Sequence, residues 1–99
     1  MSLKEKVWGL LEDGEEFVDL NGHPGVYRNG RYAMDTGGRY VGVYEESGGM
    51  RHWTGTGYEG KRQGDWVVDW GNGAGYLRRT GNDVLDGSGR LIGFIKKKI

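Results

Sequence analysis

Turn signals that contain glycine return along this chain at intervals of about 8 to 12 residues, and short segments rich in β-forming residues lie between them. Asn21-Gly22, Asn29-Gly30 and residues 35–38 are such signals. This spacing is typical of antiparallel sheets, whereas a β-α-β unit would place a helix between strands. We therefore predict a mainly β fold, a small antiparallel barrel, roll or meander. The predicted strands are 16–20, 25–28, 31–34, 39–45, 50–54, 65–70, 76–80 and 90–95.

The Asn29-Gly30 dipeptide is the clearest hairpin signal. A two-residue type I′ turn needs positive φ at both central positions, and Asn-Gly meets that need at little steric cost. A turn centred there predicts Tyr27 opposite Tyr32 and Arg28 opposite Arg31. The two guanidinium groups would then need an anion or a carboxylate between them.

The first twelve residues have a helical pattern. Ser2 and Glu5 match a capping box, and Gly14 is a stop signal after the segment. We predict a short amphipathic α-helix over residues 2–12 that covers one end or one face of the sheet, with Gly9 as its weak point. The apolar face would consist of Leu3, Val7, Leu10 and Leu11.

The length and composition limit the chain to one domain. With 99 residues it can build one modest core, so we assign a single domain to residues 1–99, with the antiparallel sheet over 15–95. There are 21 Gly but one Pro, and twelve aromatic side chains favour a folded chain over a disordered one. The absence of Cys excludes disulfides and thiolate sites. We see no secretory leader and no apolar run of about 20 residues, and we expect a cytoplasmic protein with no membrane span.

Charge is distributed unevenly although the net charge is zero. Residues 1–50 contain five basic and nine acidic side chains, and residues 51–99 contain nine and five. The simplest interpretation is that the two sets neutralise each other within one domain. An alternative is an immunity- or antitoxin-like protein that presents the acidic cluster at 12–19 to a basic toxin. A second alternative is a small-barrel nucleic-acid binder that uses the basic half, although zero net charge argues against it.

Aromatic side chains alternate along two predicted strands. Tyr40 and Tyr44 share one face of 39–45, and Trp66 and Trp70 share one face of 65–70. Glycine-rich strands leave space beside such rings, so the rings would either form the core or line an open groove. As candidate ligand-binding residues we select Trp53, Trp66, Trp70, Tyr40, Tyr44, Arg28 and Arg31.

Three short motifs suggest other functions. Asp35-Thr36-Gly37 resembles the active-site triplet of retropepsins, which implies that Asp35 would be one of two carboxylates sharing a proton in a dimeric protease. Residues 55–61 have phosphate-loop spacing, but Arg62 stands in place of the Ser or Thr and no helix follows. Residues 40–44 and 58–60 are similar to MORN repeats, but we find no third copy and expect no repeat array.

The acid-base and metal signals are few. His23 and His52 make at best half of a zinc site, and we expect neither a metal nor another cofactor. We therefore predict a binding protein without catalytic activity. It would take a small ligand in an aromatic groove or a protein partner, and it would self-associate as a homodimer because both faces of 39–45 and 65–70 are apolar or aromatic.

Overall fold

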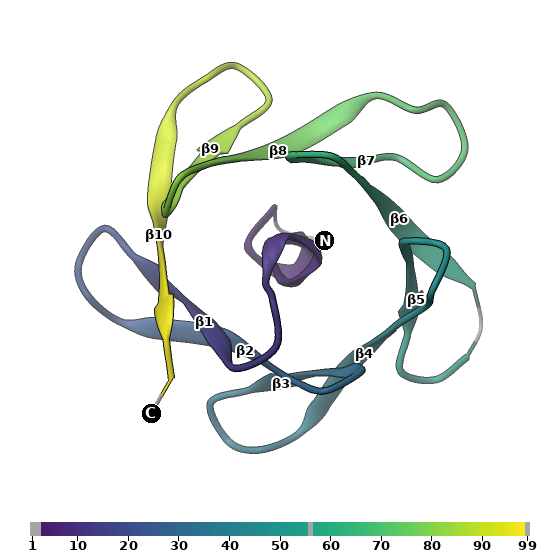
Figure 1. Cartoon of the computed structure of the whole chain (residues 1–99), viewed down its shortest axis with the longest axis horizontal. Coiled ribbons are helices and arrows are strands. Elements are labelled where there is room, and N and C mark those ends of the chain that lie inside the picture. The colour runs from purple at the N-terminus through teal and green to yellow at the C-terminus, as the bar shows by residue number, and fades with distance from the viewer. Residues whose placement is uncertain (1–2, 56, 99) are drawn as a thin grey trace.

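The sheet of this protein closes on itself. The structure is a computed structural model that describes residues 3–55 and 57–98, and these form one 3-10 helix and ten strands. Each strand runs antiparallel to the next, and the first also pairs with the last, with Phe17 opposite Ile95. Figure 1 shows the strands as a ring of hairpins around the helix. The predicted small antiparallel barrel is confirmed.

Eight of the ten strands were predicted from the sequence, and β6 and β9 were missed. In β6, Gly60 stands at a buried position and its neighbours are polar, so no alternating apolar pattern marks the strand. β9 has four residues, and two of them are the Asp residues at its ends. The elements are η1 (Leu3–Leu10), β1 (Glu15–Asp19), β2 (Pro24–Asn29), β3 (Tyr32–Asp35), β4 (Tyr40–Tyr44), β5 (Gly49–His52), β6 (Tyr58–Gln63), β7 (Trp66–Val68), β8 (Gly75–Thr80), β9 (Asp83–Asp86) and β10 (Leu91–Lys97).

One end of the barrel, the long-loop rim, carries the loops that follow β1, β3, β5, β7 and β9. Each loop begins with a side chain that accepts the backbone N–H two residues later, as in an Asx turn. These positions are sixteen or seventeen residues apart, so the chain is a fivefold repeat of one hairpin unit. Our expectation of no repeat array was wrong. The repeat is hard to see in the sequence because one of the five copies has His in the position where the others have Asp. The five residues are Asp19, Asp35, His52, Asp69 and Asp86.

The opposite end, the tight-turn rim, carries the connections between β2 and β3, β4 and β5, β6 and β7, and β8 and β9. Asn29 pairs with Tyr32, so the first turn is centred on Gly30-Arg31 and not on Asn29-Gly30 as predicted. Tyr27 therefore lies opposite Met34, and Arg28 opposite Ala33. Gly30 has a φ of 63° and Arg31 has no positive φ, which fits a type II′ turn rather than type I′.

The core is formed by the inner wall and by η1 together. Two residues before each long loop, every odd-numbered strand turns one buried apolar side chain inward: Phe17, Ala33, Met50, Val67 and Val84. A ten-stranded wall is wider than the eight-stranded barrels that side chains alone can fill. The remaining space is occupied by Val7, Trp8, Leu10 and Leu11 of the N-terminal segment, all 0% exposed.

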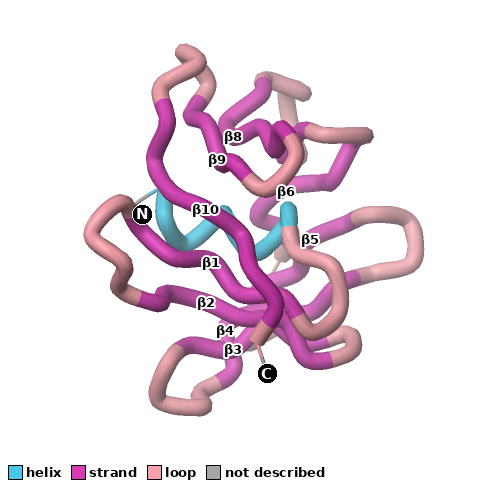
Figure 2. Tube along the Cα trace, turned by 60° about the vertical axis from the view of Figure 1, so that its left-hand side comes forward, coloured by secondary structure: helices cyan, strands magenta, loops and turns pink. Residues whose placement is uncertain are grey.

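The N-terminal helix therefore differs from the prediction in type and in place. It runs through the barrel, as Figure 2 shows, instead of covering one end or face, and it is a 3-10 helix instead of an α-helix. Residues 7–11 are all buried, so no polar face exists in that part. A 3-10 helix rises about 2 Å per residue and is narrower than an α-helix, which suits a lumen walled on all sides. The Ser2–Glu5 box and the Leu3 side chain lie outside the described residues.

Glycine allows this helix to fit. A Cβ on Gly9 would lie 2.8 Å from Val67 Cγ2, and one on Gly42 would lie 2.6 Å from Trp8 Cη2. Both distances are shorter than any ordinary carbon–carbon contact. Gly9 is therefore required by the close approach of helix and wall, although it is unfavourable for the helix alone.

Candidate functional site

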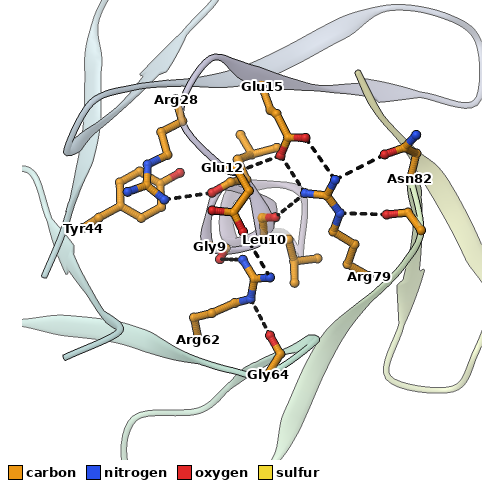
Figure 3. A network of polar contacts seen from close by, with 12 residues as sticks. Gly9, Leu10, Glu12, Glu15, Arg28, Tyr44, Arg62, Gly64, Arg79 and Asn82 are labelled. Carbon is orange, nitrogen blue, oxygen red and sulfur yellow. Dashed lines mark hydrogen bonds and ion pairs between the residues drawn. The ribbon is translucent and has the colours of Figure 1, made fainter. Parts of the chain in front are cut away.

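The C-terminal end of the buried segment is held by four side chains of the wall (Figure 3). A helix end leaves backbone carbonyls without intrahelical partners, and burial makes such carbonyls costly. Here four consecutive carbonyls are satisfied from four different strands. Arg28 Nη1 donates to Leu11 O (2.9 Å), Arg62 Nη1 to Gly9 O (3.3 Å) and Arg79 Nη1 to Leu10 O (3.0 Å), and the Tyr44 hydroxyl donates to Trp8 O.

We call Arg28, Tyr44, Arg62 and Arg79 the collar. They stand at equivalent positions in four successive even-numbered strands, next to the tight-turn rim. The guanidinium group of Arg28 lies 3.8 Å from the centre of the Tyr44 ring, and burial raises the pKa of Tyr44 above its ordinary value. Two of the predicted ligand-binding residues, Arg28 and Tyr44, therefore donate hydrogen bonds to the main chain of the N-terminal segment.

Acidic residues from the segment 12–19 complete the collar. Glu15 forms a two-pronged ion pair with Arg79, at 2.6 and 3.0 Å. The hydrogen bond from Arg79 lowers the pKa of Glu15, and Glu15 in turn raises the pKa of Arg79. Glu16 lies 3.6 Å from Lys96, and Asp13 accepts the N–H of Gly30. These contacts pair Glu15 and Glu16 with basic side chains of the same chain, whereas the side chain of Glu12 stays 65% exposed.

The other predicted aromatic residues lie on the outer wall in three separate places. Tyr40 and Trp53 stack with ring centres 4.2 Å apart, and Trp70 stacks on Tyr58 at 4.1 Å. Trp66 lies beside Arg78, 5.6 Å from its guanidinium carbon. The single aromatic groove expected from the sequence is therefore not formed by these tryptophans together.

A pocket of about 590 Å³ opens at the long-loop rim. It extends from the loops after β1, β3 and β5 into the barrel as far as Phe17 and Val26, which pack in the core. Its floor is apolar, and its rim carries three carboxylates and two imidazoles. The lining residues are Phe17, Asp19, His23, Pro24, Gly25, Val26, Asp35, Tyr40, Val41, His52, Trp53, Thr54 and Glu59.

The rim of this pocket is held in place by hydrogen bonds within its loops. Asp35 Oδ1 accepts the N–H groups of Gly37 and Arg39, both at 2.9 Å. Asp19 Oδ1 accepts two backbone N–H groups in the same way. The Asp35-Thr36-Gly37 triplet is therefore one copy of the repeated turn, which accounts for it without protease chemistry.

His52 and Thr54 have the residue types of a base and a nucleophile, and Nδ1 of His52 lies 2.7 Å from the Thr54 hydroxyl. The same nitrogen accepts the N–H of Thr54, which is the role of the Asp carboxylate in the other loops. Nε2 lies 3.9 Å from Glu59, beyond hydrogen-bond length, so the orienting contact of a catalytic triad is not made. The contacts between His52 and Thr54 therefore stabilise the turn.

Among the described residues, no three His, Cys, Asp or Glu are placed to hold a metal ion. No helix in the described part of the chain has the length and apolar character to cross a bilayer.

Two of the seven predicted site residues, Tyr40 and Trp53, line the pocket. Three others, Arg28, Arg31 and Tyr44, line a second pocket of about 550 Å³ at the tight-turn rim, together with Glu45 and Glu46. Sequence reasoning missed the apolar floor and Glu59, and it considered His23 and His52 only as at best half of a zinc site. The fivefold Asx-turn repeat was the signal that could have placed three loops at one rim.

No family model, curated protein or solved structure matches this chain.

Proposed function

We propose that this protein binds a small molecule in the pocket at the long-loop rim, without catalysing a reaction. The observation that carries the proposal is the pocket itself, which has an apolar floor inside the barrel and a polar rim outside it. Its volume lies within the range of about 300 to 1,000 Å³ that is usual for small-molecule sites.

The rigidity of the walls supports this function. The floor belongs to strands of a closed barrel, and the rim loops are fixed by side-chain acceptors for their own N–H groups. A pocket held in this way needs little ordering when a ligand arrives, so less of the interaction free energy is lost on binding.

A fragment screen followed by NMR amide shifts tests the proposal. Hits should move the signals of pocket residues, and Val41→Trp, which fills the pocket, should abolish binding while the variant still unfolds cooperatively. Because Val41 is half-buried, His23→Trp at the mouth provides a second test, since that side chain is 78% exposed. Arg90→Trp is the matched control, because Arg90 has the equivalent place in the loop after β9. Hits that map elsewhere, or that bind the filled variants equally well, would contradict the proposal.

Self-association is a second candidate, favoured by large rings on the outer wall of β4 to β7. Tyr40, Trp53, Tyr58 and Trp70 are each 43–47% exposed. The inner face needs no partner because the N-terminal segment fills it, and the acidic and basic halves already pair within the chain. A dimer would therefore rest on the outer aromatic wall rather than on charge. Light scattering coupled to size exclusion at micromolar concentration should give a dimer mass, and Trp70→Ala should shift it toward the monomer.

A cytoplasmic location stays a prediction, which cell fractionation would test.

A further inference from the structure

We infer that the ligand of this pocket is an organic cation, an amine or quaternary ammonium attached to an apolar body. The inference rests on the proposed function, because it names the chemical class that the same pocket would select.

Apart from the imidazoles of His23 and His52, which lie 3.7 Å from Asp19 and 3.9 Å from Glu59, the side chains that line the pocket and carry charge near neutral pH are carboxylates. Asp19, Asp35 and Glu59 contribute carboxylates, and none of the described lining residues is Lys or Arg. One ammonium group, that of Lys6, contacts the main chain of a lining residue. It donates to the main-chain carbonyl of Glu59 at 3.1 Å and lies 4.2 Å from the centre of the Tyr76 ring. The pocket therefore has a negative rim, which complements a cation and repels an anion.

Glu59 is the strongest single attraction for a positive charge. Its side chain is 10% exposed, and its nearest ion-pairing partner among the described residues is His52 Nε2, at 3.9 Å. A carboxylate with so little contact with water is stabilised by a charged or hydrogen-bonding partner. Since ionised carboxylates only accept hydrogen bonds, a ligand that brings donors or a positive charge would provide that partner.

The remaining walls fit the apolar part of such a ligand. The floor of the pocket is apolar and consists of Phe17, Val26 and Val41, which suit the apolar part of the ligand. The stacked rings of Tyr40 and Trp53 form one side of the pocket. Aromatic rings attract ammonium groups through their negative faces, and Trp is the best of them. A neutral alcohol would fill the same floor but would leave the rim charge uncompensated.

Three probes with the same phenyl body test the inference: phenethylammonium, phenethyl alcohol and phenylacetate. Each is titrated at neutral pH and low salt against the full chain, and NMR amide shifts give both the site and the affinity. We expect the ammonium to bind about tenfold more tightly than the alcohol, and phenylacetate to bind most weakly, as one charge contact at an effective dielectric near 20 allows. Glu59→Gln should lower the ammonium affinity to that of the alcohol and leave the alcohol affinity unchanged.

Two further variants keep the test decisive. Glu46→Gln removes a carboxylate of the same type from the tight-turn rim and should leave the order of the probes unchanged. If Glu59→Gln does not fold, Asp35→Asn takes its place, because an Asn oxygen preserves the turn while the charge is lost. If alcohol and ammonium bind equally in the pocket, or if neither Glu59→Gln nor Asp35→Asn changes the ammonium affinity, the inference of a cationic ligand is overturned and the proposed function stays intact. If none of the three probes moves the pocket signals, both proposals fail.

Discussion

Replacement of Arg79 by Met should destabilise the protein more than the same change at any other collar arginine. Arg79 and Glu15 are 15% and 12% exposed, and their two hydrogen bonds are 2.6 and 3.0 Å long. Loss of one partner from a largely buried ion pair costs about 3 to 5 kcal/mol. The carbonyl of Leu10 also loses its donor. Because a domain of this kind has about 5 to 15 kcal/mol in total, the loss takes a large part of its stability.

Arg62→Met is the matched control. Each of the two arginines donates its Nε to a turn carbonyl, Arg79 to Gly81 O and Arg62 to Gly64 O. Arg62 also donates to a carbonyl of the buried segment, Gly9 O, but that hydrogen bond is 3.3 Å long. Its acidic neighbour Glu12 lies 3.7 Å away and is 65% exposed, so the ion pair is weak. We expect a loss of about 1 kcal/mol for Arg62→Met.

The measurement is urea unfolding followed by Trp fluorescence, at neutral pH and again in acid. Arg79 lowers the folded-state pKa of Glu15 from its ordinary value of 4.5. The pair therefore stabilises the native state fully above pH 4.5, and this contribution is lost as the pH falls through the lower, folded-state value. The difference between the wild type and Arg79→Met should shrink in acid. Equal losses for the two arginine variants, or a difference that does not change with pH, would refute this account of the collar.

Three further variants test the barrel and its contents, each by the shift of the unfolding free energy. Gly30→Val should cost about 1 to 3 kcal/mol because a β-branched residue is strained at positive φ, whereas Arg31→Val in the same turn should change little. Gly42→Ala should cost about 1 to 3 kcal/mol by forcing Trp8 to move, and an unchanged midpoint would show that the segment does not pack here. Leu10→Ala should cost about 2 to 5 kcal/mol, since this side chain is 0% exposed; a loss below 1 kcal/mol would mean that the lumen relaxes around the cavity.

Local signals sufficed for most of the wall. Glycine turns at short intervals, with β-forming residues between them, predicted eight of the ten strands, because the turn requirement and the strand preference both lie within a few residues. β6 escaped because Gly60 faces the core where an apolar side chain was expected. The first hairpin turn was predicted one residue too early, on Asn29-Gly30 instead of Gly30-Arg31. The error arose because the Asn29-Gly30 dipeptide is compatible with a type I′ and with a type II′ turn.

The candidate site was much less accessible to sequence reasoning. Tyr40 and Trp53 were selected for their rings, and they do line the pocket. Glu59 and Phe17 could not be selected, since they are 42 residues apart and meet only after three hairpins have curved around the barrel. Arg28 was selected for a ligand but contacts Leu11 instead, because the buried end of the N-terminal segment needed donors for its carbonyls.

The amino-acid sequence by itself determined the repeated unit, a strand, an Asx loop, a second strand and a glycine turn, since each part depends on the conformational preferences of neighbouring residues. The tertiary structure decided what five such units do together. Closure of β1 on β10 enclosed a lumen too wide for wall side chains, and the segment with Trp8 and Leu10 fills it because its apolar side chains are fully buried there. The same closure placed Glu59 in the lining of a pocket that Phe17 also lines. Because the two residues are far apart in the sequence, no local sequence pattern could indicate that they share a site.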